Sequence, residues 1–70
     1  MKAYRTQSPY YFSSKRLLTV GAVVFFSDKI KRYVHPTEGI LLDEYPRLQL
    51  LSEEEIKAVE AQGNDILAKY

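Results

Sequence analysis

The sequence predicts a small α+β domain in which short, mainly antiparallel strands are followed by one C-terminal helix. Three observations lead to this prediction. Between residues 9 and 50 the apolar runs are short and are separated by turn-forming residues, as in sheets built from hairpins. A helix-capping sequence then begins at Ser52. The chain has 70 residues, which is enough for one hydrophobic core and too few for two, so we expect residues 1–70 to form a single domain.

The first strands are predicted from aromatic and β-branched runs. Residues 10–12 are three aromatic side chains between a proline and two serines, which is typical of a short strand. The apolar stretch that follows has Gly21 near its middle, where a glycine usually marks a bend or a turn. We therefore expect two strands, over residues 16–20 and 22–26. The second is apolar on both faces, which indicates a central strand or one face reserved for a partner.

Residues 28–35 allow two interpretations. As a helix, the segment has a serine and an aspartate at its N-terminus and an apolar face formed by Ile30, Tyr33 and Val34. As a strand, it would place the guanidinium of Arg32 between two apolar side chains. The pattern favours a short helix over residues 28–35, which the following proline ends.

The remaining elements lead into the C-terminal helix. A glycine followed by three aliphatic residues predicts a strand at 40–42, and polar–apolar alternation predicts another short strand or an extended segment at 47–50. Ser52 and Glu55 form a capping box, so a helix is expected from residue 53. Gly63 is compatible with a C-terminal cap or with a close approach of another backbone to one continuous helix. We expect a helix over 53–62 and a separate turn over 65–69.

The residues that most enzymes need are sparse in this chain. It has no cysteine and one histidine, His35, which precedes a proline in a predicted turn. The three glycines stand alone, without the spacing of a phosphate-binding loop, and the acids lack the rhythm of a calcium loop. We therefore expect no enzymatic activity, no cofactor, no metal and no small-molecule substrate.

The apolar segments also bear on location. The N-terminal residues have no apolar core, so we expect no secretory signal. The longest apolar stretch is ten residues, residues 17–26, and about 20 are needed to cross a bilayer. We expect a protein without a membrane span, in the cytoplasm of the producing or host cell or within a larger assembly there.

Charge is distributed unevenly along the chain. Residues 1–35 contain seven Lys or Arg and one acid, a net charge of 7 − 1 = +6, whereas residues 36–70 contain three bases and eight acids, 3 − 8 = −5. Such a chain can pair its halves within one molecule, pair them between neighbouring copies, or offer the basic half to an anionic partner. The sequence does not distinguish among these three arrangements.

The basic half also contains seven of the nine aromatic residues, interleaved with the cations. Tyrosine and arginine are enriched at protein interfaces, and single-stranded nucleic-acid binders combine stacking rings with cations in the same way. Rings that fill strand positions beside solvated lysines give the same pattern without any partner. The residues we expect to bind a partner are Arg5, Tyr10, Tyr11, Lys15, Arg16, Lys31, Arg32 and Tyr33.

Residues 20–42 carry a resemblance to a known group. The run from Val20 to Val34 resembles small proteins encoded among phage and prophage morphogenesis genes, in which a glycine-bent β segment leads through Ser and Asp into a short helix. A glycine and an apolar strand follow there, as Gly39 and residues 40–42 do here, although residues 36–38 are an insertion relative to that pattern. The resemblance implies a non-enzymatic accessory or virion component and carries over no functional residue.

Taken with the residue inventory, these patterns favour a non-catalytic protein-interaction module that acts by docking or self-assembly, of a phage-type structural or accessory kind. The alternative is a small nucleic-acid-binding accessory protein that uses the basic, aromatic-rich half.

Overall fold

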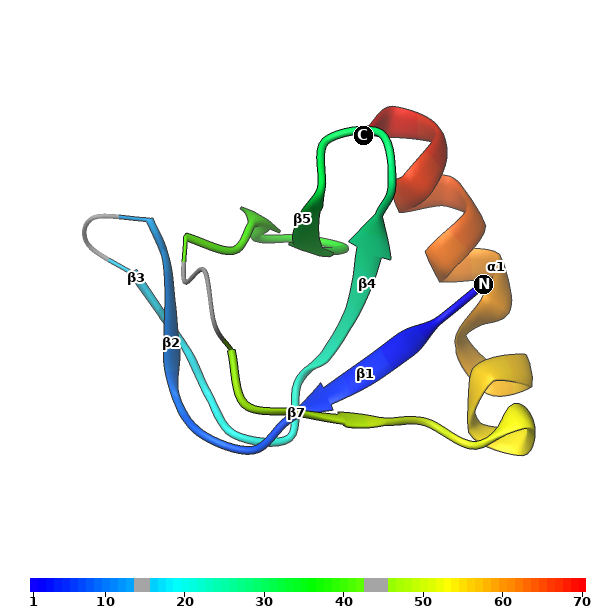
Figure 1. The fold of residues 1–70 in the computed structure, drawn as a ribbon, viewed down its shortest axis with the longest axis horizontal. Coiled ribbons are helices and arrows are strands. Elements are labelled where there is room, and N and C mark those ends of the chain that lie inside the picture. The colour runs from blue at the N-terminus through cyan, green and yellow to red at the C-terminus, as the bar shows by residue number, and fades with distance from the viewer. Residues whose placement is uncertain (14–15, 43–45) are drawn as a thin grey trace.

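The computed structural model describes residues 1–13, 16–42 and 46–70, and within them the chain forms strands followed by one helix (Figure 1). This arrangement confirms the predicted α+β class, with antiparallel pairing throughout the described strands. In chain order the elements are β1 (Ala3–Thr6), β2 (Tyr10–Ser13), β3 (Arg16–Leu18), β4 (Val23–Ser27), β5 (Arg32–His35), β6 (Gly39–Ile40), β7 (Leu48–Leu50) and α1 (Glu53–Lys69).

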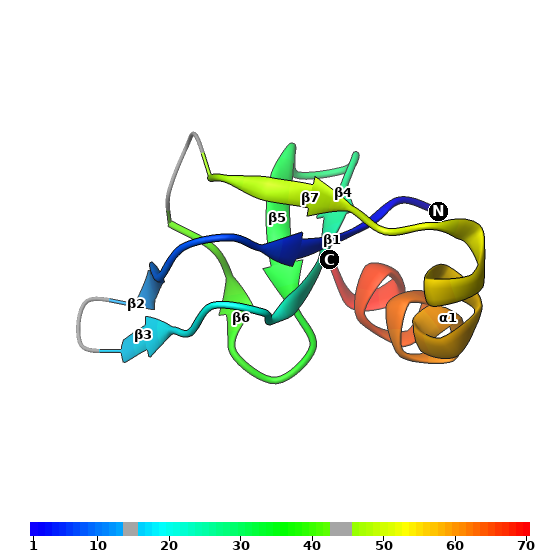
Figure 2. The same cartoon turned by 90° about the horizontal axis from the view of Figure 1, so that it is seen from below.

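The strands form a five-stranded sheet with the order β6-β5-β4-β1-β7 and a separate two-stranded hairpin, β2-β3. The strand β1, which was not predicted, lies inside the sheet, between β4 and β7. The apolar β4 is the central strand that its sequence indicates. The hairpin and α1 lie at opposite ends of the molecule in both views (Figures 1 and 2).

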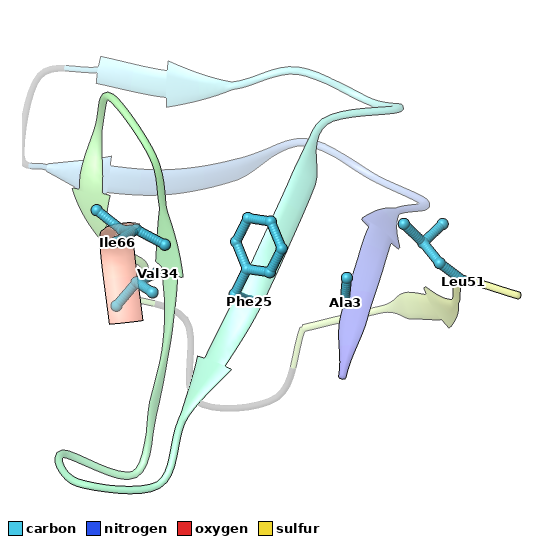
Figure 3. Packing of buried hydrophobic residues seen from close by; sticks show 5 residues of the cluster. All are labelled: Ala3, Phe25, Val34, Leu51 and Ile66. Atoms are coloured by element: carbon cyan, nitrogen blue, oxygen red, sulfur yellow. The ribbon is translucent and has the colours of Figure 1, made fainter. Parts of the chain in front are cut away.

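One face of the sheet is covered by α1. Its buried cluster contains Ala3, Phe25 and Val34 from the sheet, Leu51 before the helix, and Ile66 from the helix (Figure 3). Phe25 lies in the middle of this cluster and is fully buried. We call this side of the sheet the helix face.

The opposite face of the sheet is covered only in part. A second buried cluster joins Tyr10 and Leu18 of the hairpin to Val24 of β4 and to Leu41. The partly buried rings of Tyr4 and Tyr33 pack against its edge. We call this side the hairpin face. Because each hairpin strand has only three or four residues, it covers part of this face and leaves neighbouring rings half-exposed.

Thr6 holds the base of the hairpin to β1. Its hydroxyl donates a hydrogen bond to the Thr19 carbonyl and accepts one from the Ala22 N–H, both at 3.0 Å. Backbone bonds of 2.9 Å also join Thr6 to Gly21 and Ala22. Gly21 adopts a φ of 87°, which favours glycine, and so supplies the turn predicted between the two apolar segments.

The short helix predicted over residues 28–35 is wrong. Residues 28–31 make a tight turn closed by a 2.8 Å bond from the Lys31 N–H to the Ser27 carbonyl, and the chain then enters β5. Lys31 takes a left-handed φ of 57°, which ends the helical turn after one bond. Pairing with β4 then buries Val34 opposite Phe25. The capping signals at the start of the segment therefore mark a hairpin turn.

The C-terminal helix begins as predicted and continues further. Ser52 and Glu55 make both hydrogen bonds of the capping box, at 3.0 and 3.3 Å. The predicted break at residues 63–64 is absent, since α1 runs unbroken to Lys69. Gly63 is buried, and a Cβ placed there would lie 2.6 Å from the Phe25 ring and from the Met1 sulfur. The glycine is present because the ring packs directly on the helix backbone.

Candidate binding surfaces

Of the eight residues predicted to bind a partner, the seven that the structure describes lie in three places. Lys15 is outside the described residues. The hairpin carries Tyr10, Tyr11 and Arg16, the region from the β4–β5 turn into β5 carries Lys31, Arg32 and Tyr33, and β1 carries Arg5. The structure therefore places six of these residues in two groups and leaves Arg5 apart. The two groups meet where Tyr33 packs against the buried cluster that contains Tyr10.

The outer side of the hairpin is an exposed apolar patch. Tyr11 pairs across the hairpin with Leu17, and these side chains are 61% and 50% exposed. Leu42, which is 50% exposed, lies next to Tyr11, because its N–H donates a 3.1 Å hydrogen bond to the Tyr11 carbonyl. Both residues line the same hollow. We call Tyr11, Leu17 and Leu42 the hairpin patch. Tyr10 points to the other side, where it is 5% exposed and part of the core.

Arg16 and His35 lie beside the patch but make contacts within the chain. The Arg16 guanidinium is 3.2 Å from the Glu38 carboxylate, and both residues line a hollow of about 470 Å³ with His35. The Nδ1 atom of His35 accepts hydrogen bonds from the N–H groups of Thr37 and Glu38, at 3.3 and 3.2 Å. Burial lowers the pKa of His35, and the Glu38 carboxylate opposes that shift in part. The ring is therefore held neutral, with Nδ1 as an acceptor.

Arg5 contacts the C-terminal helix. Its guanidinium is 3.0 Å from the Glu55 carboxylate. The hydrogen bond from the Ser52 N–H is the largest cause that lowers the pKa of Glu55, and Arg5 lowers it further. The Arg5–Glu55 and Arg16–Glu38 pairs each join the basic half of the chain to the acidic half. Pairing of the halves within one molecule therefore accounts for two of the basic residues.

Three rings on the hairpin face form an aromatic cluster. Tyr33 on β5 lies directly opposite Phe26 on β4, and their ring centroids are 4.9 Å apart in an edge-to-face contact. The Tyr4 ring on β1 meets the Tyr33 ring at 5.4 Å and an angle of 88°. Burial and the neighbouring Tyr4 raise the pKa of Tyr33, so its hydroxyl stays protonated at neutral pH.

These rings line a pocket of about 490 Å³ beside the chain's N-terminus. We call it the aromatic pocket. Its other lining residues are two apolar ones and one charged residue of each sign: Met1, Leu67, Lys2 and Asp28.

The β4–β5 turn borders the aromatic pocket and is rich in cations. Residues 28–32 hold three bases and one acid, a net charge of 3 − 1 = +2, and we call them the basic turn. Lys29 and Lys31 are exposed, and Arg32 is half-buried. None of these three makes an ion pair with another residue that the structure describes. The basic turn therefore keeps its positive charge beside a set of half-buried rings.

Two negative findings apply to the described part of the chain. Its histidine and carboxylate side chains nowhere gather in a group of three or more that could hold a metal ion. The only helix in it, α1, is not long and apolar enough to cross a membrane.

Sequence reasoning missed several residues of both surfaces. Tyr4 and Phe26 of the aromatic pocket, and Leu17 and Leu42 of the hairpin patch, were not in the predicted set. One signal was available for Tyr4, because residues 3–6 place β-forming side chains before a turn sequence. Phe26 becomes a neighbour of Tyr33 only through the β4–β5 register, which the helix prediction precluded.

We compared the chain with protein families, curated proteins and solved structures. None of the three comparisons finds a match.

Proposed function

We propose that this chain is a non-catalytic protein-interaction module that docks on a protein partner through the hairpin patch. The observation that carries this proposal is the exposure of three neighbouring apolar residues: Tyr11 and Leu17, which pair across the hairpin, and Leu42, whose backbone bonds to Tyr11. The hairpin, β2-β3, lies at the end of the molecule away from α1 (Figure 1). Contiguous exposed apolar groups favour association, because burying them against a partner removes them from water. A phage-type structural or accessory component is the kind of protein that this role fits.

The backbone of the hairpin supports a docking role. Thr6 fixes its base, and the inner residues Tyr10 and Leu18 anchor it in the core. A patch held on a fixed scaffold loses little conformational entropy when it binds, which improves affinity. The surroundings of His35 support the non-catalytic part of the proposal, because backbone N–H groups occupy the nitrogen atom that a base would use.

The partner is either another protein or a second copy of this chain, and one pair of variants addresses both. Leu17→Thr removes apolar area from the patch and introduces a β-branched residue, which favours a strand. The matched control is Val20→Thr, because Val20 is also exposed, at 59%, but lies outside the patch. Both variants should keep the thermal unfolding of the parent, because both positions are exposed.

Sedimentation over a range of protein and salt concentrations tests self-association. Affinity capture from a lysate of the source cell, followed by titration of the purified candidate, tests a different partner. The proposal predicts an association that survives Val20→Thr and is lost in Leu17→Thr. An association that is equally strong in both variants, or a chain that stays monomeric and captures no protein, contradicts it.

A further inference from the structure

We propose that the aromatic pocket and the basic turn together bind an unpaired nucleic-acid strand, with a base stacked on the rings and phosphates on the lysines. This function goes beyond the proposed protein docking and uses a different part of the molecule. The pocket includes Leu67 of α1, whereas the hairpin patch lies at the end of the molecule away from that helix (Figure 1).

The three rings are arranged for stacking. Tyr4, Phe26 and Tyr33 come from three adjacent strands, and the two edge-to-face contacts fix their orientations. All three residues are half-buried, and all three line the pocket. The pocket volume of about 490 Å³ is within the range of small-molecule sites. Bases stack on such rings whatever their sequence, because every base has a π face.

The polar groups of the pocket suit the edges of a base. The Tyr33 hydroxyl stays protonated, so it can donate a hydrogen bond as well as accept one. Lys2 donates from the rim, and Asp28 can accept from an exocyclic amino group. In a duplex these base faces and edges are stacked and paired, and a pocket on a sheet reaches them only in an unpaired strand.

The positive charge of the basic turn favours the same ligand, an unpaired nucleic-acid strand. The cations of the basic turn have no ionic partner among the described residues, and they follow directly from β4, which carries Phe26. The five acids of α1 are not among the residues that line the pocket, to which this helix contributes Leu67. An unpaired strand supplies a ring and a phosphate at every nucleotide, and so matches both the rings and the cations. An acidic peptide would match only the cations.

The test is a fluorescence-anisotropy titration of labelled oligothymidylate, alone and as a duplex with oligoadenylate, at two salt concentrations. We expect the single strand to bind more tightly than the duplex, with affinity that falls as salt rises. Phe26→Leu should weaken binding of the single strand by roughly 5- to 150-fold, the range found for removal of one stacking ring. Tyr11→Leu, which removes an exposed ring from the hairpin patch, is the matched control and should leave binding unchanged.

A charge pair of variants tests the phosphate contacts. The double change Lys29→Gln and Lys31→Gln should reduce the slope of log affinity against log salt by about 1.4, since each single-strand phosphate contact contributes about 0.7. The control, Lys57→Gln with Lys69→Gln, removes the same charge from α1 and should reduce the slope much less. Circular dichroism verifies that each variant is folded. If Phe26→Leu does not fold, Tyr4→Leu carries the same prediction.

Four results would overturn the proposal. One is the absence of binding at tens of micromolar protein and low salt. The second is equal affinity for single strand and duplex, and the third is single-strand binding that does not change when the ring is removed. The fourth is competition by polyglutamate as effective as that by unlabelled strand, which would assign the site to an acidic protein. None of these results bears on docking through the hairpin patch, because that surface is tested with its own variants.

Discussion

The two faces of the sheet differ in how completely they are covered. On the helix face, a 17-residue capped helix packs Ile66 and the backbone at Gly63 against Phe25. On the hairpin face, strands of three and four residues bury Val24 but leave Tyr4 and Tyr33 half-exposed. Adjacent residues of β4 therefore have different surroundings, with Phe25 fully buried and Phe26 half-buried at the aromatic pocket.

We propose that this small domain separates stability from binding across one sheet. The helix face supplies most of the packing, and the hairpin face keeps accessible aromatic and aliphatic groups at two separate sites. Substitutions on the two faces test this division.

Phe25→Ala should lower the free energy of unfolding by about 3–5 kcal/mol, because it opens a cavity in the centre of the helix-face cluster. Such a loss approaches the whole stability expected for a domain of this size. Phe26→Ala should cost clearly less, since that ring is only half-buried. Urea unfolding followed by circular dichroism measures both. Equal losses at the two positions would contradict the division.

Gly63→Ala should destabilise the protein by about 1–3 kcal/mol, although alanine is the better helix former by about 1 kcal/mol. The added methyl group would overlap the Phe25 ring, which is held on all sides. Ala61→Gly, at an exposed helix position, is the control and should cost only the propensity difference of about 1 kcal/mol. Thermal unfolding of Gly63→Ala and Ala61→Gly measures both effects. A melting temperature of Gly63→Ala above that of the parent would show that the Phe25 ring is not packed tightly on the helix at residue 63.

Thr6→Val should cost about 1–2 kcal/mol, because it leaves the Thr19 carbonyl and the Ala22 N–H without the hydroxyl that now bonds both. The matched change Thr19→Val alters an exposed side chain and should be nearly neutral. Hydrogen exchange of the hairpin amides should speed up in the first variant only. If Thr6→Val leaves both exchange and stability unchanged, Thr6 does not hold the hairpin.

His35 should give a small pH dependence of stability. Its pKa in the folded chain is below its ordinary value of 6.5, so below that pH the unfolded chain binds more protons. Stability should therefore be constant above about pH 6.5 and fall as the pH drops toward the folded pKa. Chemical denaturation at a series of pH values, compared with His35→Gln, isolates this contribution. An equal slope in the variant would assign the dependence to other groups.

Local patterns predicted the parts of the fold that depend on neighbouring residues. The capping box fixed the start of α1, and Gly21 placed the turn between two apolar strands. The same logic failed at residues 28–35, where serine and aspartate begin either a helix or a hairpin turn. The pairing of Val34 with Phe25, nine residues away, decided in favour of the strand.

The sequence did not predict β1, and it predicted only part of the aromatic pocket, for related reasons. In β1 only Ala3 and Thr6 are buried, so no apolar run marks a strand that becomes central only by pairing with β4 and β7. The aromatic pocket is likewise assembled across three strands and the start of the chain. Composition singled out the basic, aromatic-rich half as a region, but register decides which of its rings are exposed together and which, like Tyr10, are buried.

The most direct test of the division between the two faces compares Phe25→Leu with Phe26→Leu, which remove the same ring from adjacent positions of β4. Urea unfolding and single-strand titration are measured on both variants, at a temperature where both are folded. We expect Phe25→Leu to lose stability and keep the affinity of the parent, and Phe26→Leu to lose affinity while keeping most of its stability. Loss of affinity in Phe25→Leu together with unchanged binding by Phe26→Leu would contradict the assignment of binding to the hairpin face.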